Sequence, residues 1–201
     1  MDVAIVKYNA GNIYSVVNAM KRLGINPILT DDAEMLQKAD RVLFPGQGQA
    51  KEAMEYLKAH QLDQVIKNLT QPVLGICVGQ QLLCRHSEEG DVDCIGIFDV
   101  NVKRFKPQKH EDKVPAMGWN ELYDLKTDLY KGLSHPYSYF VHSYYVPLRG
   151  DNRYSRLYPP LQCIFTQRQF LYLPIPPRKK RKGRGTNLEK FLGLITQPTE
   201  N

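Results

Sequence analysis

Residues 75–79 place a cysteine between two glycines, Gly75-Ile76-Cys77-Val78-Gly79, directly after the apolar run Pro72-Val73-Leu74. The apolar run predicts a buried strand, and Gln80 to His86 predicts a helix. A side chain lifted at such a strand-to-helix turn has a strained backbone, and only small neighbours avoid clashes there. The pattern therefore predicts a parallel-sheet strand that presents Cys77 as a nucleophile. A glycine-lined turn with an inert thiol is the alternative that the spacing alone leaves open.

The rest of the first 90 residues alternates strand and helix patterns, which predicts a parallel sheet covered on both faces. Apolar residues recur at helical spacing from Ile13 to Leu23, where Gly24 ends the pattern, and the two residues Asp31 and Asp32 can cap a short helix through Lys38. The expected strands are Val3–Val6, Pro27–Thr30, Arg41–Phe44 and Pro72–Ile76, and a further helix is expected from Lys51 to Asn68.

After Gly90 the chain is rich in β-branched and aromatic residues, which favours antiparallel additions to the sheet. The expected additions are Ile95–Phe105, Met117–Tyr123 and Tyr137–Val146. The predicted fold class is therefore α/β: an open, mostly parallel (mixed) twisted sheet with helices on both faces. Residues 1–201 are expected to form a single domain.

Composition excludes several classes of protein. No apolar run approaches the roughly 20 residues that a membrane span needs, and Met1-Asp2-Val3-Ala4 does not begin a signal peptide, so we expect a cytoplasmic protein without a membrane. The four cysteines show neither a CxxC pair nor zinc spacing with histidine. We therefore expect no metal and no cofactor, and we interpret Cys84, Cys94 and Cys163 as small buried hydrophobic residues.

A second loop is expected beside the Cys77 turn. Phe44-Pro45-Gly46-Gln47-Gly48 ends the neighbouring strand, and the carboxyl ends of parallel strands meet at one crevice. Its glycines would let backbone N–H groups approach a ligand, although a Pro-Gly turn without function is the simpler interpretation. We expect the Val78 N–H to receive an oxyanion, and the following helix to lower the pKa of the Cys77 thiol.

These motifs together resemble the class I glutamine amidotransferases, and within them the glutaminase subunit of imidazole glycerol phosphate synthase (HisH). The blocks that carry the resemblance cover about three quarters of the chain, and those at 114–120 and 139–145 are the most specific to HisH. They are Tyr8-Asn9-Ala10-Gly11-Asn12-Ile13, Phe44-Pro45-Gly46-Gln47-Gly48, Gly75-Ile76-Cys77-Val78-Gly79-Gln80-Gln81-Leu82-Leu83, Val114-Pro115-Ala116-Met117-Gly118-Trp119-Asn120 and Tyr139-Phe140-Val141-His142-Ser143-Tyr144-Tyr145.

The resemblance implies a role for each matching position. Cys77 would attack the glutamine carboxamide and release ammonia, which a HisF-type (β/α)8 cyclase subunit would receive for histidine biosynthesis in a heterodimeric lyase. The oxyanion would be bound by Gly46, Gln47, Gly48 and Val78, although Gln47 stands where a small apolar residue is usual in the family. The substrate would be held by Gln81, Ser143 and Tyr144, and the partner would lie near Asn12, Met117, Trp119 and Asn120.

The chain departs from the family at its general base. The family takes the base from a His-Pro-Glu motif near the C-terminus, but none of the five histidines here follows His142, which we interpret as structural. The motif is expected near Pro176–Lys179, where the sequence reads Pro-Pro-Arg-Lys. Without the base, a cysteine hydrolase should lose roughly 10⁴-fold or more in rate, so the chain as written is expected to be impaired.

The segment from Arg149 to Gly185 has a net charge of +9, against −3 for the remainder, and five prolines. We expect it to pack poorly and to oppose a central strand. Read one base later, codons for Pro174 to Gly183 permit Gln-Phe-His-Pro-Glu-Lys-Ser-Gly-Lys, which resembles the missing motif. We therefore hypothesise that residues 149–190 are out of frame, with an offset that opens near Leu148. A DNA read across Pro147 to Leu194 would reject this if the codons are in frame.

Two other functions remain open at this point. The basic run from Arg178 to Arg184 could make the chain a non-catalytic, basic-tailed RNA-binding module, although the rest of the sequence carries no nucleic-acid motif. Another cysteine hydrolase could use the same turn, but the block Met117-Gly118-Trp119-Asn120 argues against it. The resemblance favours the glutaminase, with glutamine as substrate and no nucleic acid as partner.

Overall fold

The computed structural model describes residues 1–9, 11, 13–107, 110, 113–121, 137–147, 166–167 and 170–173. At its centre is a six-stranded sheet in the order β11-β12-β4-β3-β1-β2, in which only β11 is antiparallel to its neighbour. This confirms the predicted open, mostly parallel sheet. The strands are β1 (Val3–Val6), β2 (Ile28–Thr30), β3 (Arg41–Gly46), β4 (Val73–Cys77), β11 (Thr166–Gln167) and β12 (Phe170–Leu173).

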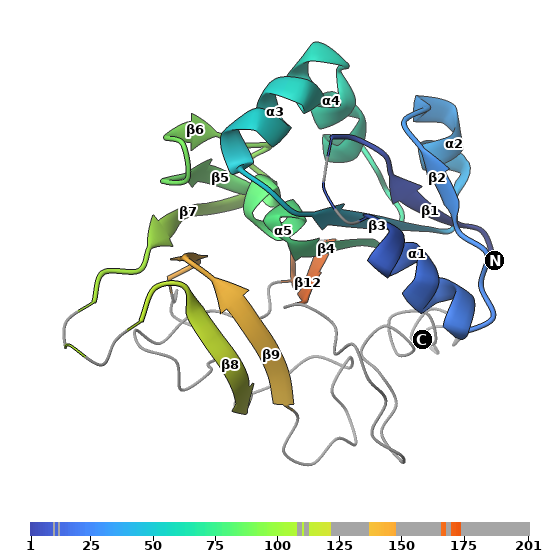
Figure 1. The fold of residues 1–201 in the computed structure, drawn as a ribbon. Coiled ribbons are helices and arrows are strands. Elements are labelled where there is room, and N and C mark those ends of the chain that lie inside the picture. The colour runs from blue at the N-terminus through green and yellow to red at the C-terminus, as the bar shows by residue number, and fades with distance from the viewer. Residues whose placement is uncertain are drawn as a thin grey trace, which may run out of the picture.

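Helices cover the sheet on both sides, with α3 and α4 on one side and α1 on the other (Figure 1). The core is apolar because β1, β3 and β4 are buried along almost their whole lengths, as strands covered on both faces must be. The helices are α1 (Ile13–Arg22), α2 (Ala33–Lys38), α3 (Ala50–Ala59), α4 (Leu62–Lys67) and α5 (Val78–Leu83).

Local sequence signals end and begin these helices as predicted. Gly24 adopts a φ of 77° just past α1, and its N–H donates to the Lys21 carbonyl oxygen at 3.0 Å, which satisfies an otherwise orphaned carbonyl. At α2, the Asp32 carboxylate accepts a hydrogen bond from the Met35 N–H at 2.9 Å, which is an N-cap. Both predicted helix boundaries are confirmed.

Two smaller sheets follow the strand-to-helix turn at Cys77 in the chain. The first has the order β10-β7-β5-β6, and the second pairs β8 with β9 antiparallel. The predicted antiparallel additions are confirmed for β8–β9 and β10–β7, but β7 runs parallel to β5, contrary to expectation. The strands are β5 (Cys84–Ser87), β6 (Val92–Asp93), β7 (Phe98–Arg104), β8 (Ala116–Glu121), β9 (Tyr137–His142) and β10 (Tyr144–Tyr145).

For two helices the predicted residue range was too long. The helix expected over Gln80–His86 ends at Leu83, because Cys84 turns extended and pairs with Phe98 of β7, so tertiary pairing overrides the local pattern. The helix expected over Lys51–Asn68 is two helices, separated where Gln61 adopts a left-handed φ of 56°. No glycine, proline or asparagine marks that break in the sequence.

The prediction that the segment after Arg149 opposes a central strand was wrong for four residues. Phe170–Leu173 form β12, which lies between β11 and β4 and runs parallel to β4. These four residues are all apolar or aromatic, and the dense positive charge begins only at Arg178, so the charge does not oppose pairing there. Apart from β11, the remainder of the segment lies outside the described residues, and the expectations of poor packing and a shifted frame stay predictions.

Candidate active site

Cys77 ends β4 and immediately precedes α5, with φ of 56° and ψ of −120°. Side chains with a Cβ rarely adopt a positive φ, and such strain persists where the surroundings enforce it. Here the enforcing contacts are close backbone approaches. A Cβ on Gly79 would collide with the Phe44 carbonyl of β3, and one on Gly75 would lie 3.1 Å from the Gln80 Cα and 3.2 Å from its backbone nitrogen. The two glycines flanking Cys77 are therefore required for the turn.

The end of β3 lies directly beside this cysteine. In the β3–β4 ladder Gly46 is paired with Cys77, and a Cβ on Gly46 would collide with the Gly79 N–H. Gly48 follows with a φ of 114°, a conformation that glycine adopts readily. The Val78 N–H donates to the Cys77 sulfur. We call residues 45–48 the glycine strip. Gly46 of this strip and the Val78 N–H both lie beside Cys77.

The pKa of the Cys77 thiol is raised above its ordinary value, because burial disfavours the thiolate. The Val78 N–H lowers the pKa, as we expected of the α5 N-terminus, but it does not offset burial, and the negative charge of Glu89 adds to the rise. The α5 N-terminus therefore acts in the predicted direction, but the net shift of the pKa is upward because burial outweighs it. At neutral pH the free thiol needs a base to become a nucleophile.

Glu89 is a site residue that the sequence analysis missed. Its carboxylate accepts a hydrogen bond from the Ala50 N–H at the start of α3 and acts electrostatically on Cys77. Burial raises the pKa of Glu89, and its Oε2 is buried without a hydrogen-bond partner. The only sequence signal was an acidic pair before Gly90. A half-buried carboxylate whose second oxygen is buried and has no hydrogen-bond partner can pair with a cationic group that reaches it.

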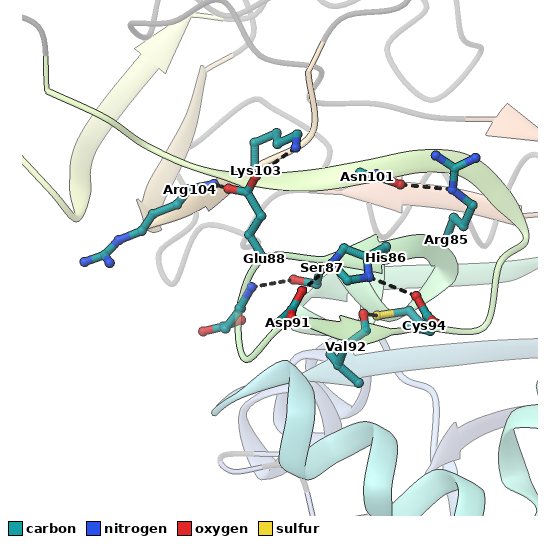
Figure 2. Close-up of polar contacts among 12 residues, drawn as sticks. Arg85, His86, Ser87, Glu88, Asp91, Val92, Cys94, Asn101, Lys103 and Arg104 are labelled. Carbon is teal, nitrogen blue, oxygen red and sulfur yellow. Dashed lines mark hydrogen bonds and ion pairs between the residues drawn. The ribbon is translucent and has the colours of Figure 1, made fainter.

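The connection between β5 and β6, which carries Glu89, is held by ion pairs (Figure 2). The two ring nitrogens of His86 contact Asp91 at 3.2 Å and Asp93 at 2.9 Å. Glu88 accepts hydrogen bonds from Lys103 Nζ and from the backbone N–H of β7, both at 2.8 Å. These contacts fix the hairpin on both sides of Glu89, so the position of its backbone is well defined.

Among the predicted substrate residues, Gln81 lies buried on α5, one turn after Cys77. Ser87 Oγ donates to Gln81 Oε1 at 3.4 Å and accepts from the Glu89 N–H at 3.1 Å, which links the amide to the Glu89 backbone. Ser143 and Tyr144 are half-buried; the Ser143 carbonyl accepts from the Phe105 N–H at 2.9 Å, and Tyr144 pairs with β7. All three therefore attach to α5 or to the sheet that continues from it.

His142 has the surroundings of a structural residue. Its Nδ1 donates to the Tyr144 carbonyl at 2.8 Å, and its ring packs against Phe105 and Phe140. Burial lowers the pKa of His142 to about 4, so the ring is neutral at pH 7. Among the described residues that perturb the pKa of Cys77, none is a histidine.

The place expected for the missing base follows β12. Because β12 runs parallel to β4 with Leu173 opposite Ile76, it ends at the same edge of the sheet as Cys77. Pro174 and the expected motif position Pro176–Lys179 follow it in sequence and lie outside the described residues. The strand direction therefore agrees with the position at which the resemblance expects a base.

The β8–β9 pair carries exposed apolar side chains. Met117 is 61% exposed, Trp119 56% and Val141 37%, and Met117 pairs directly with Val141, so all three share one face. Asn120 is half-buried and its Nδ2 donates to the Gly118 carbonyl at 3.3 Å. Asn12, the fourth predicted partner residue, lies outside the described residues. We call Met117, Trp119 and Val141 the β8–β9 patch.

The described residues form neither a metal-binding cluster nor a membrane-spanning helix. Their His, Cys, Asp and Glu side chains do not gather in any group of three or more that could hold a metal ion. Within the same residues, every helix is too short or too polar to cross a membrane.

Comparisons with known proteins agree with this geometry. A family model for the CobB/CobQ-like glutamine amidotransferase domain matches residues 2–119. Imidazole glycerol phosphate synthase subunit HisH of Bacteroides fragilis (strain YCH46) is 60% identical over 199 residues, covering 96% of this chain and 100% of that protein. HisH of Bacteroides thetaiotaomicron is 52% identical over 196 residues, with the same coverage of both chains.

The fold is also that of a solved glutamine amidotransferase. The two structures superpose with a TM-score of 0.65 at 16% identity, over 86% of this chain and 88% of the other, a likeness that concerns the fold alone. The sequence relatives decide the family, since they match nearly the whole chain at high identity. The chain therefore belongs to the glutamine amidotransferases, and within them to the family of imidazole glycerol phosphate synthase subunit HisH.

Proposed function

We propose that this chain provides the glutamine-hydrolysing site of an imidazole glycerol phosphate synthase, with Cys77 as its nucleophile. The observation that carries the proposal is the strained φ of Cys77 directly beside the glycine strip. Strain of this kind is kept where it serves a site, and a thiol beside a glycine-rich backbone segment and the Val78 N–H suits acyl transfer. Free glutamine is the proposed substrate and the cytoplasm the proposed compartment.

The reaction follows from the groups around the sulfur. The Cys77 thiolate attacks the carboxamide carbon, and the carbonyl oxygen becomes an oxyanion bound by the strip at Gly46–Gly48 and by the Val78 N–H. Collapse of this intermediate breaks the C–N bond, and the nitrogen leaves as ammonia after taking a proton. Water then attacks the thioester, which releases glutamate and regenerates the thiol.

Glutamine would be oriented by groups at the other end of the site. Glu89 presents an unpartnered carboxylate oxygen, which suits the α-ammonium group of the substrate. With its oxygen engaged by Ser87, the Gln81 amide can direct its N–H₂ donors to the α-carboxylate. Ser143 and Tyr144 are proposed to complete this end of the pocket. As a structural alternative, Glu89 could serve only to cap α3 through Ala50.

The weak point of this chain is proton transfer. The raised pKa of Cys77 leaves the sulfur protonated at pH 7, and the expected His-Pro-Glu is absent from the sequence. We propose that residues 149–190 are out of frame, and that the chain as written is a slow hydrolase, reduced by roughly 10⁴-fold or more. A repaired chain is defined as one carrying the sequence read one base later from Arg149 to Asn187.

The partner is proposed to be a HisF-type (β/α)8 cyclase subunit that receives the ammonia. The relatives are named as subunits of imidazole glycerol phosphate synthase, and the β8–β9 patch offers exposed apolar side chains of the kind enriched at the centre of interfaces. Trp119→Ala should weaken binding of that subunit by roughly 10-fold or more, whereas Met35→Ala, an exposed apolar residue on α2, serves as the control.

Ammonia release tests the activity itself. The chain as written, the repaired chain and a Cys77→Ala version of each are incubated with glutamine and the cyclase subunit. We expect the repaired chain to release ammonia roughly 10⁴-fold faster than the chain as written. A repaired chain that stays at its Cys77→Ala background would reject the proposal. The basic-tailed RNA-binding alternative has no support from the comparisons reported above.

A further inference from the structure

Tyr8 follows β1, the strand next to β3, and its hydroxyl lies against the glycine strip close to Cys77. Its side chain is 7% exposed, its ring packs at 5.5 Å from that of Phe44, and its hydroxyl donates to the Pro45 carbonyl oxygen at 2.6 Å. A hydroxyl that is buried at this depth normally has a specific partner. The partner here belongs to the strip itself, and the contact spans 37 residues of sequence.

The strand order gives this hydrogen bond a direction. β3 lies between β1 and β4, and Tyr8 follows β1, so the Pro45 carbonyl is held toward the β1 side. In a trans peptide the N–H points opposite to the carbonyl, and the Pro45–Gly46 bond is not among the cis bonds of the described chain. The Gly46 N–H is therefore directed toward the β4 side, where Cys77 ends its strand.

A second hydrogen bond fixes the Gln47 carbonyl, two residues after Pro45. The Gly11 N–H donates to the Gln47 carbonyl oxygen at 3.2 Å, so the segment after β1 fixes two peptide planes of the strip. Tyr8 also limits the position of Gly46, because a Cβ there would lie 2.7 Å from its hydroxyl oxygen. The strip is thus held by hydrogen bonds from Tyr8 and Gly11 and by the close approach of α5 at Gly79.

We propose that Tyr8 is a positioning residue that orients the glycine strip for binding the oxyanion formed at Cys77. The inference rests on the proposed function, because it assumes that the strip binds that oxygen. Burial, and then the neighbouring Cys77, raise the pKa of the Tyr8 phenol far above its ordinary value. The hydroxyl therefore keeps its proton at any working pH and stays a donor to Pro45.

The test uses a ligand that needs the oxyanion site but no general base. Glutamate γ-semialdehyde can add to Cys77: the thiol proton goes to solvent, the thiolate sulfur bonds to the aldehyde carbon, and the C=O π electrons move to the oxygen, which becomes an alkoxide. That oxygen occupies the oxyanion position. The dissociation constant is measured on the full chain by protection of Cys77 from iodoacetamide, whose own reaction forms no oxyanion and reports thiol access alone.

We expect Tyr8→Phe to weaken semialdehyde binding by roughly 10- to 100-fold, below the 10²–10³ that loss of a whole oxyanion donor costs. Its iodoacetamide rate should stay within about twofold of wild type, since no oxyanion forms in that reaction. Tyr56→Phe on α3, a matched substitution outside the site, should change neither quantity. Thermal unfolding identifies any loss of fold, and 3-fluorotyrosine at position 8, which keeps the donor, should retain tight binding.

The outcomes separate the two proposals. If wild type binds the semialdehyde and Tyr8→Phe binds it equally well, Tyr8 does not position the strip and the inference fails while the proposed function stands. Equal weakening of semialdehyde binding and of the iodoacetamide rate would likewise overturn it, because a general loss of structure would explain both. If wild type forms no adduct, the proposed function fails, and this inference fails with it.

Discussion

The strain at Cys77 can be measured by replacing this one residue in two ways. Cys77→Ala and Cys77→Gly both remove the sulfur, so the loss of its buried contacts is common to both variants. Only glycine relieves the φ of 56° at ψ of −120°. A strained conformation of this kind costs on the order of 1–3 kcal/mol, and the extra freedom of glycine in the unfolded chain takes back about 0.5–1 kcal/mol.

The strain relieved by glycine, less its cost in the unfolded chain, predicts that Cys77→Gly is more stable than Cys77→Ala by about 1 kcal/mol. For a chain of this size that raises Tm by roughly 2–4 °C, which scanning calorimetry resolves. Ala53→Gly in α3 is the control, because Ala53 is helical and buried; there the same replacement of alanine should cost about 1 kcal/mol. A Cys77→Gly variant no more stable than Cys77→Ala would refute strain at the turn.

Three further predictions follow from the described contacts. The rate of Cys77 alkylation by iodoacetamide should titrate above the ordinary thiol pKa of about 8.5, and Glu89→Gln should move that midpoint to lower pH; an unmoved midpoint would contradict the coupling. Gly79→Ala should cost at least about 2 kcal/mol in urea unfolding, because its Cβ meets a backbone carbonyl, and more than Gly24→Ala, where only the positive φ opposes a side chain. His142, with its pKa of about 4, favours the folded state fully above pH ~6.5, and this contribution should fall by up to about 3 kcal/mol as pH drops to ~4; His142→Phe should lose that dependence.

The turn around Cys77 was predictable because short-range sterics dictate it. The spacing of Gly75 and Gly79 about the cysteine, after a buried strand, leaves few other conformations, and the structure has the expected one. The parallel sheet was predictable for a similar reason, since apolar strands alternate with amphipathic helices from Val3 to Leu83. Both predictions depend on residues close together in sequence.

The failures involve contacts between distant segments. The lowering effect of α5 on the pKa of Cys77 was visible in sequence, whereas the burial and the charge of Glu89, which raise that pKa, come from tertiary packing and were missed. Glu89 itself reaches the site only because the β5–β6 hairpin folds against α3. The pairing of β5 with β7, which is also a contact between distant segments, ends α5 at Leu83, three residues before the predicted end.

The shifted-frame hypothesis belongs to a third class, since no fold argument reaches it. It rests on the codons that could encode Pro174 to Gly183, and β12 adds only that Leu173 ends at the edge of the sheet where Cys77 lies. A DNA read across Pro147 to Leu194 addresses that hypothesis without any protein. The nucleophile, in contrast, can be tested on the chain as it is written.

The most direct test of the central claim is covalent labelling of the full chain by a chloroketone analogue of glutamine, with the modified residue identified by mass spectrometry. At pH 9, where the missing base matters least, the account predicts one adduct on Cys77, slowed by excess glutamine and absent from Cys84 and Cys94. Labelling that ignores glutamine, or that leaves Cys77 unmodified in the folded chain, would contradict it.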